Sequence, residues 1–187
     1  MTIKKFIGKI SYLLDKSEID YAVTGGVAVS VWGRPRYTAD VDIVIEISSS
    51  DKIEIFIDLV QKEFKNIYAD KEMALDAFKR KSEFNLIESE YGLKADFFVV
   101  RLNEYERERI KRALKKKIGQ KMVNFVSPED LIISKLLWYK KSQSTRHLED
   151  IQSVLDIQKK IDRPYLTAWI RKIDLNKEWG ALGKLKK

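Results

Sequence analysis

Three aspartates in apolar segments have the types and spacing needed to hold a divalent cation. Asp40 and Asp42 are two residues apart, so on a β-strand both carboxylates point to the same face. Asp96 stands near the start of a second apolar segment, Lys94–Val100, which could lie beside the first. Neighbouring carboxylates raise one another's pKa unless a cation neutralises them, and Mg²⁺ prefers oxygen ligands. We therefore predict a Mg²⁺ site, with Mn²⁺ as an alternative ion. The competing interpretation is a strand face with solvated acids.

A glycine pair, Gly25-Gly26, precedes these aspartates. It follows the short apolar segment Tyr21–Thr24 and leads into a brief helical pattern over Val27–Trp32. Backbone N–H groups at such a strand-to-helix junction can come close to a phosphate. Paired glycines alone more often serve a tight turn or close packing. Followed by thirteen residues, an Asp-x-Asp pair and a later strand aspartate, they form the ordered signature of a nucleotide-transfer site.

This pattern resembles that of the DNA polymerase β-like nucleotidyltransferase superfamily. The segments Val23–Val29 and Gly33–Asp42 are similar to its compact bacterial branch, which includes the AbiEii-type abortive-infection toxins. The segments Ser127–Lys135 and Arg146–Ile151 are similar to that branch's lysine helix and its Arg-x-x-x-Asp segment. The resemblance covers roughly residues 20 to 155.

The resemblance implies an α/β (α+β) nucleotidyltransferase fold, with a small mixed β-sheet flanked by helices, and a two-metal mechanism. Asp40 and Asp42 would hold Mg²⁺ on the triphosphate of an NTP. Asp96 would join at the second metal and is the candidate acceptor of the attacking hydroxyl's proton. A nucleoside monophosphate (NMP) would move from the NTP to a hydroxyl, with release of pyrophosphate.

Five residues are predicted to bind the nucleotide. Gly25 and Gly26 would bind phosphate through backbone N–H groups, and Lys135 would reach the triphosphate as a point charge. The alternative for this lysine is to extend its charged end out of a packed helix. Arg36 and Thr38 precede the aspartate pair and are the remaining candidates. A solvated loop is the alternative interpretation of both.

Other residues have simpler explanations. Arg146 and Asp150 are four apart on an expected helix, and a surface ion pair is the favoured interpretation. His147 is expected to be structural or at the surface. Three tryptophans in apolar helical contexts are expected in the core: Trp32, Trp138 and Trp169. Trp138 has a second interpretation, with Tyr139, as part of the lining of a nucleotide pocket beside Lys135.

Composition excludes several classes of site. The chain has 187 residues, no Cys and one His, which excludes disulfides, thiolate zinc sites, iron–sulfur clusters and three-histidine zinc sites. Lysines 4, 5 and 9 interrupt any signal-peptide pattern. The longest uncharged run, residues 21–33, is too short for the roughly 20 apolar residues of a membrane span. We therefore expect no membrane association and a cytoplasmic location.

The net charge of +8 is unevenly distributed. Residues 1–100 carry 14 Lys+Arg and 17 Asp+Glu, a net of −3, whereas residues 101–187 carry 22 and 11, a net of +11, and the two sum to +8. Between residues 107 and 121, eight basic side chains accompany one acid, which predicts contact with a polyanion. A solvated helix face is the alternative. The predicted acceptor-binding residues in this run are Lys115, Lys116 and Lys117.

Together these features predict a Mg²⁺-dependent nucleotidyltransferase that uses an NTP. The basic half favours RNA as the acceptor, in particular a tRNA 3′ end, over a cationic aminoglycoside. The toxin resemblance implies a role in a toxin–antitoxin or abortive-infection system, with a separate antitoxin as partner. Two alternatives stay open: transfer onto a partner protein, and a non-catalytic nucleic-acid- or partner-binding module of the same fold.

The expected elements place the motifs in two parts, a catalytic core over residues 1–126 and a helical extension over residues 127–187. Helices are expected at 6–17, 27–32, 51–64, 73–78, 104–114, 128–141, 145–160 and 164–173. Strands are expected at 21–24, 41–47, 84–87 and 94–100. The segment 115–126 is expected to form a hairpin or one bent strand around Gly119, and the chain end a frayed tail.

Overall fold

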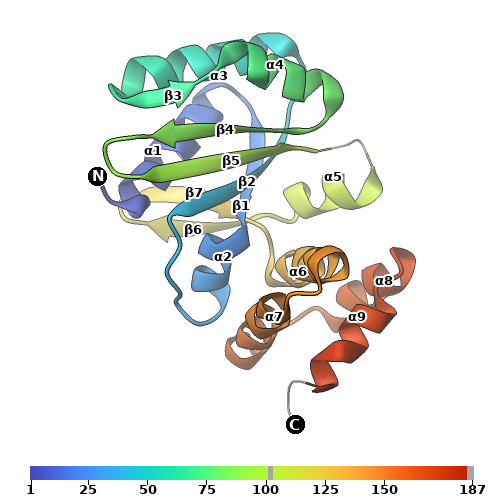
Figure 1. Ribbon diagram of the computed structural model, residues 1–187. Helices are drawn as coiled ribbons and strands as arrows, with labels where there is room; N and C mark the ends of the chain where they lie inside the picture. The colour runs from blue at the N-terminus through green and yellow to red at the C-terminus, as the bar shows by residue number, and fades with distance from the viewer. Residues whose placement is uncertain (101–102, 185–187) are drawn as a thin grey trace.

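The computed structural model describes residues 1–100 and 103–184, and this part of the chain contains a seven-stranded mixed sheet (Figure 1). The strand order is β3-β4-β5-β2-β1-β7-β6. The strands are β1 (Asp20–Thr24), β2 (Asp40–Glu46), β3 (Ile67–Ala69), β4 (Glu83–Glu88), β5 (Leu93–Val99), β6 (Leu114–Ile118) and β7 (Lys121–Phe125). The pairs β2–β5 and β1–β7 are parallel and the other pairs are antiparallel. The sheet is therefore mixed, as predicted.

Helices cover both faces of the sheet. They are α1 (Ile3–Lys16), α2 (Gly25–Trp32), α3 (Ser50–Glu63), α4 (Lys71–Arg80), α5 (Glu104–Lys111), α6 (Pro128–Ser142), α7 (Thr145–Ile157), α8 (Arg163–Lys172) and α9 (Asn176–Ala181). On one face α1 packs against β7 and α3, and α3 packs against α4. On the other, α2 contacts β2, α6 and α7. The helices from α6 to α9 gather beyond this second face (Figure 1).

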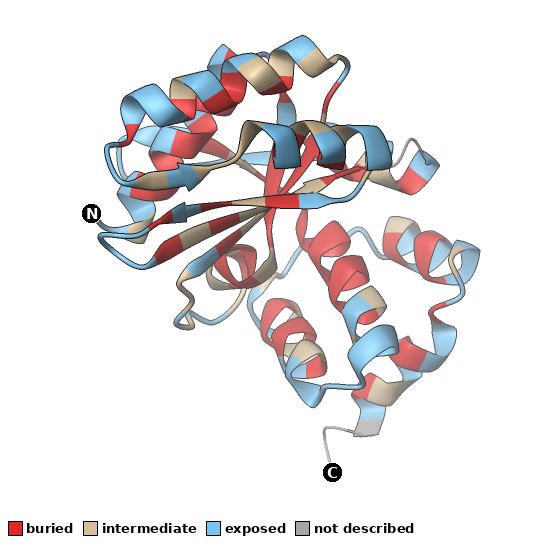
Figure 2. Ribbon diagram, turned by 45° about the horizontal axis from the view of Figure 1, so that its top comes forward, coloured by how far each residue is buried: buried red, intermediate tan, exposed pale blue. Residues whose placement is uncertain are grey.

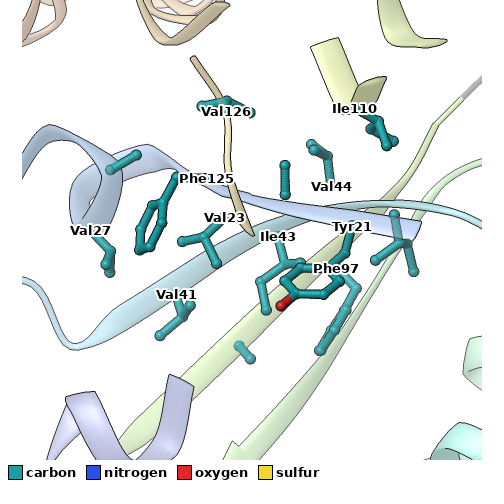
Figure 3. Close-up of a cluster of buried hydrophobic side chains, with 14 of the residues drawn as sticks. Tyr21, Val23, Val27, Val41, Ile43, Val44, Phe97, Ile110, Phe125 and Val126 are labelled. Atoms are coloured by element: carbon teal, nitrogen blue, oxygen red, sulfur yellow. The ribbon is translucent and has the colours of Figure 1, made fainter. Parts of the chain in front are cut away.

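The hydrophobic core is centred on the middle strands of the sheet. Side chains from β1, β2, β5 and β7 meet there, including Val23, Ile43, Phe97 and Phe125, which are fully buried (Figure 3). The ring of Phe97 stacks on that of Phe84 with centroids 4.8 Å apart. Burying one such side chain contributes about 2–3 kcal/mol. The polar residues of β2 and β5 are therefore attached to a rigid support.

Helix α6 begins as its sequence predicts. The Ser127 side chain accepts a hydrogen bond from the Asp130 N–H (3.1 Å), and Pro128 occupies the first turn. Residues 128–136 are buried, which makes α6 the most deeply packed helix of the second face (Figure 2). The first nine residues of α6 are therefore packed into the protein, whereas its last turn, from Trp138, reaches the surface.

Most predicted elements are confirmed, and the fold class is the predicted one. The segment 115–126 is the β6–β7 hairpin, turning at Gly119 with φ of +61°. The three-residue strand β3 was too short to show a pattern. The expected frayed tail is wrong over residues 176–184, where α9 and a 3₁₀ turn form because Leu175 and Leu182 are buried on either side.

No helix in the described residues combines the length and the apolar character needed to cross a bilayer.

Candidate active site

The predicted aspartates lie on adjacent parallel strands. Asp42 of β2 and Asp96 of β5 are register partners, and Asp40 is the partner of Lys94. Register partners on neighbouring strands, which run roughly 4.8 Å apart, point to the same face. The two carboxylates therefore lie side by side, and Asp40 shares their face of the sheet.

The turn between β1 and α2 lies directly on Asp42. Gly25 has φ of +62°, and a Cβ at this position would stand 1.7 Å from Asp42 Oδ2. The Gly26 backbone amide is close enough to the Asp42 carboxylate to act against the rise in its pKa. A Cβ on Gly26 would lie 2.8 Å from Arg36 Nη2. Glycine is required at Gly25 both by the backbone angle and by the approach of the carboxylate.

The carboxylate cluster needs positive charge. Burial raises the pKa of Asp42, and the neighbouring Asp96 and Asp40 charges raise it further, while Lys135 acts in the opposite direction. Lys94 Nζ lies 2.9 Å from Asp96 Oδ2, and this hydrogen bond raises the pKa of the lysine. In this structure the Lys94 ammonium is therefore the nearest counter-charge of the cluster.

The donor set suits an ion that shares its ligands with a substrate. Within residues 1–100 and 103–184, no group of three or more His, Cys, Asp or Glu side chains is arranged to hold a metal ion by itself. Asp42 and Asp96 supply two carboxylates from register partners on adjacent strands. Mg²⁺ is commonly bound by one or two carboxylates together with water and substrate phosphates. The pair fits that mode of binding and not a closed protein cage.

The opposite wall of the site comes from α6 and α7. Lys135 is 6% exposed, and its Nζ lies 2.8 Å from Asp150 Oδ2. Arg36 Nε lies 3.4 Å from Asp150 Oδ1. Asp150, also 6% exposed, thus pairs with two cations. The predicted surface pair of Arg146 with Asp150 is wrong, because Asp150 faces Lys135, and so is the alternative that Lys135 extends out of its helix.

A cavity of about 450 Å³ lies between the two walls. Among its lining residues are the three aspartates and all the predicted nucleotide-binding residues: Gly25, Gly26, Arg36, Thr38, Asp40, Asp42, Asp96 and Lys135. The structure thus brings together residues that are up to 110 positions apart in the chain. Their roles stay predictions, but their convergence on one cavity follows from the fold.

Lys115, Lys116 and Lys117 do not line this cavity. They lie on β6, an edge strand, and are exposed there. Lys116 Nζ is 4.5 Å from the centroid of the Trp32 ring, on the α2 side. Lys115 is instead close to Asp15 of α1, where burial raises the pKa of the carboxyl and the Lys115 charge opposes that rise. Neighbouring residues of a strand face opposite sides, so the three lysines do not form one surface. For these three lysines the alternative of a solvated helix face is wrong, because they lie on a strand, whereas residues 107–111 of the same basic run belong to α5.

The cavity lining also contains residues that no sequence motif predicts. Arg109, Ser134, Leu137 and Lys141 also line it, and Arg109 is a buried side chain paired with Glu106. Nothing in the sequence distinguishes these residues from their neighbours.

The tryptophan prediction is confirmed at two positions and wrong at one. Trp32 and Trp169 are 4% and 8% exposed, as expected of core residues. Trp138 is 48% exposed and lines the cavity instead, together with His147, whereas Tyr139 is not among the lining residues. Helical spacing predicts that a residue lies near an apolar face but not whether another element covers it.

The sequence matches one protein family, described as "Nucleotidyl transferase AbiEii toxin, Type IV TA system", over residues 12–179. Curated protein sequences gave no match.

Solved nucleotidyltransferase structures share the fold. The solution structure of the antibiotic-resistance factor ANT(2'')-Ia aligns with a TM-score of 0.59 at 15% identity, covering 95% of each chain. An antigenic nucleotidyltransferase-like protein from Paracoccidioides brasiliensis aligns at 0.53 and 20% identity, covering 95% of this chain and 92% of its own. The lincosamide antibiotic adenylyltransferase LnuA, bound to lincomycin, aligns at 0.53 and 15% identity, covering 84% and 98%.

Proposed function

This chain belongs to the AbiEii nucleotidyl transferase family, and we propose that it is a Mg²⁺-dependent enzyme that transfers NMP from an NTP to the 3′ hydroxyl of an RNA, in particular a tRNA. The observation that carries the proposal is the pair of aspartates Asp42 and Asp96, which are register partners on adjacent strands, with the Gly25-Gly26 turn packed against Asp42. A phosphodiester forms at the α-phosphorus, pyrophosphate leaves, and Asp96 accepts the proton of the acceptor hydroxyl.

Asp40, Asp42 and Asp96 are the proposed ligands of Mg²⁺, or of Mn²⁺ in its place. The raised pKa of Asp42 and the position of Lys94 support a site that is built to receive positive charge. When bound, such ions neutralise phosphate charge and lower the pKa of the attacking hydroxyl. The contribution of the chain is to hold the carboxylates rigidly on β2 and β5 at the edge of the cavity.

The basic end of the cavity is the proposed triphosphate site. The Gly25-Gly26 turn opens α2, and helix N-termini favour anions. Lys135 and Arg36 lie beside this turn, and Asp150 fixes both side chains in place. The Thr38 hydroxyl donates to the Asp40 carbonyl oxygen (3.1 Å), which supports the loop that presents the aspartates.

An anionic acceptor suits the remaining charges of the cavity. Apart from the three aspartates, Asp150 is the only acid among its lining residues in the described chain, and its carboxylate is already paired with two cations. Lys141 and Arg146 lie on the same lining. A cationic acceptor such as an aminoglycoside would need free acids there. RNA would instead meet basic side chains.

The toxin role is part of the same proposal. The family description names a toxin of a type IV toxin–antitoxin system. We extend that role, and a separate antitoxin, to this chain. Expression of the wild type in a bacterial host should arrest growth, whereas the Asp42→Asn variant should not.

The direct test incubates the protein with Mg²⁺, each α-labelled NTP in turn, and either bulk tRNA or a cell lysate. Wild type should transfer label to RNA, and Asp42→Asn should not. Asp20→Asn is the matched control, because Asp20 is an exposed strand aspartate at the far end of β1. Label on protein and not on RNA would mean that the acceptor is a partner protein and would refute the assignment to RNA. No transfer and no metal-dependent NTP binding would refute an enzymatic function.

A further inference from the structure

The cavity has one wall that the proposed chemistry leaves unused. Trp138, near the end of α6, exposes 48% of its surface, while Trp32 and Trp169 are almost completely buried. A single exposed apolar side chain is common on any protein surface. This one lies inside the cavity that also contains Asp42 and Lys135. A half-exposed indole in the lining of that cavity suits a ligand with an aromatic plane.

The surroundings of Trp138 are aromatic and basic. The His147 ring, contributed by α7, lies nearly parallel to the indole, with an interplanar angle of 24° and centroids 6.5 Å apart. Lys141 Nζ lies 5.2 Å from the indole centroid. Burial lowers the pKa of His147, as do the charges of Lys135 and Arg146, while Asp150 acts in the opposite direction.

Two further cations of the cavity lining, Lys141 and Arg146, are available to a ligand. Lys141 and Arg146 are both exposed, and neither has a carboxylate within 4.0 Å among the described residues. Asp150, one helical turn after Arg146, is instead occupied by Lys135 and Arg36. The basic side chains that could contact the NTP phosphates are therefore distinct from those that flank Trp138.

We propose that Trp138, flanked by Lys141 and Arg146, is a stacking platform for the terminal base of a single-stranded RNA 3′ end, whose phosphates the two cations contact. Single-stranded RNA is typically bound by aromatic stacking combined with basic side chains along its backbone. The platform is open to solvent, as a polymer end entering the cavity requires. It rests on the proposed function, since it supplies the place of the RNA acceptor.

The test measures binding without catalysis. Wild-type protein, without NTP, is titrated with a short fluorescein-labelled single-stranded RNA carrying a free 3′ hydroxyl, and with the same RNA carrying an abasic 3′-terminal nucleotide. Base stacking on an aromatic residue accounts for about 1–3 kcal/mol, so Trp138→Leu should weaken RNA binding by about tenfold or more. Trp138→Phe should restore most of the affinity. Removing the terminal base should weaken binding to the wild type but not to Trp138→Leu.

Tyr68→Leu is the matched control, because Tyr68 is 47% exposed on β3, at the opposite edge of the sheet from β6. It should bind both RNAs as the wild type does. The Lys141→Gln/Arg146→Gln double variant should reduce the slope of log affinity against log salt by up to about 2. Thermal unfolding of each variant checks that the fold is retained.

The outcomes separate this inference from the proposed function. Equal RNA affinity of wild type and Trp138→Leu would overturn the platform. Loss of Mg²⁺–NTP affinity in Trp138→Leu, with unchanged RNA affinity, would assign the platform to the base of the NTP and overturn its assignment to the acceptor. If wild type bound RNA through Trp138 but transferred no label to any acceptor, the proposed function would fail and the platform would stand.

Discussion

The two walls of the cavity are built from different kinds of structure. The strand wall consists of neighbouring residues on β2 and β5, with Asp42 and Asp96 on one rung. The helix wall consists of side chains from α6 and α7, with Lys135 buried against Asp150. The strand wall is acidic and half-exposed, whereas the helix wall is basic and, at its centre, closed to solvent. The strand wall holds like charges close together, whereas the carboxylate of the helix wall, Asp150, is paired with two cations.

This difference predicts opposite consequences for stability. Asp42 has a raised pKa because burial and neighbouring carboxylates disfavour its charge, so the strand wall is maintained at a cost to folding. Asp150 instead compensates two cations, and removal of one partner from a buried ion pair is strongly destabilising. Variants of the strand-wall carboxylates should lose activity without losing stability. Variants of the helix wall should lose both.

Asp42→Asn should have the largest effect on activity and the smallest on folding. We expect a loss of about a thousandfold or more in kcat/KM, because the amide cannot neutralise a cation. The melting temperature should stay equal or rise, because one of two adjacent like charges is removed. Calorimetric melting and label transfer measure the two effects. A clear fall in melting temperature would contradict the division between the walls.

Gly25→Ala should lower activity by about a hundredfold and should also destabilise the fold. The added Cβ would collide with Asp42 Oδ2 at 1.7 Å, and the φ of +62° costs a non-glycine residue about 1 kcal/mol. Gly92→Ala is the matched control, since Gly92 has the same φ of +62° but nothing within 4 Å of its Cβ position. Equal loss of activity in both variants would show that backbone strain, and not contact with the aspartate, is responsible.

Asp150→Asn should reduce both stability and activity. It leaves Lys135 and Arg36 without a carboxylate, and we expect a loss of about 3 kcal/mol in the free energy of unfolding and of tenfold or more in kcat/KM. Asp156→Asn is the control, because its pair with Arg34 (2.9 Å) is largely exposed and should contribute less than about 1 kcal/mol. Chemical denaturation measures the free energy of unfolding of both variants, and label transfer measures their activity. A similar loss of unfolding free energy in the two variants would mean that the buried Asp150 pairs stabilise the fold no more than the exposed Arg34–Asp156 pair does.

The two walls also differ in how far the sequence predicts them. Asp40 and Asp42 share a face because strand geometry has a period of two, so their convergence with Asp96 needed one further assumption, that the strands are neighbours. The pairing of Lys135 with Asp150 depends on how α6 packs against α7. Helical periodicity places Arg146 next to Asp150 on one helix and therefore predicts the wrong ion pair, because it carries no information about the neighbouring helix. The exposure of Trp138 likewise depends on what the fold leaves uncovered.

Lys94→Gln should make cation binding to the strand wall a few-fold tighter. The Lys94 ammonium is 2.9 Å from Asp96 Oδ2 and competes with an ion for that oxygen. Removing it also leaves the carboxylates uncompensated, so the metal-free protein should melt at a slightly lower temperature. The melting temperature as a function of Mn²⁺ or Mg²⁺ concentration, without NTP, measures both effects. Lys52→Gln is the control, since Lys52 pairs with the exposed Glu18. Weaker cation binding in Lys94→Gln would mean that the lysine supports the site rather than competing with the ion.

The smallest effects are expected at the edge strand β6, which belongs to neither wall. If Lys115, Lys116 and Lys117 bind RNA as predicted, each replacement by Gln should lower affinity only about two- to threefold, because these lysines are exposed. Strand alternation distinguishes the lysines by the face of the sheet on which each lies. Lys116 lies on the α2 side, where the cavity is, whereas Lys115 faces α1. An RNA end in the cavity should therefore respond to Lys116→Gln but not to Lys115→Gln, with Mg²⁺–NTP affinity unchanged in both. RNA titrations at two salt concentrations measure this difference. An equal response of the two variants would mean that the RNA does not approach β6 from the side of the helix wall.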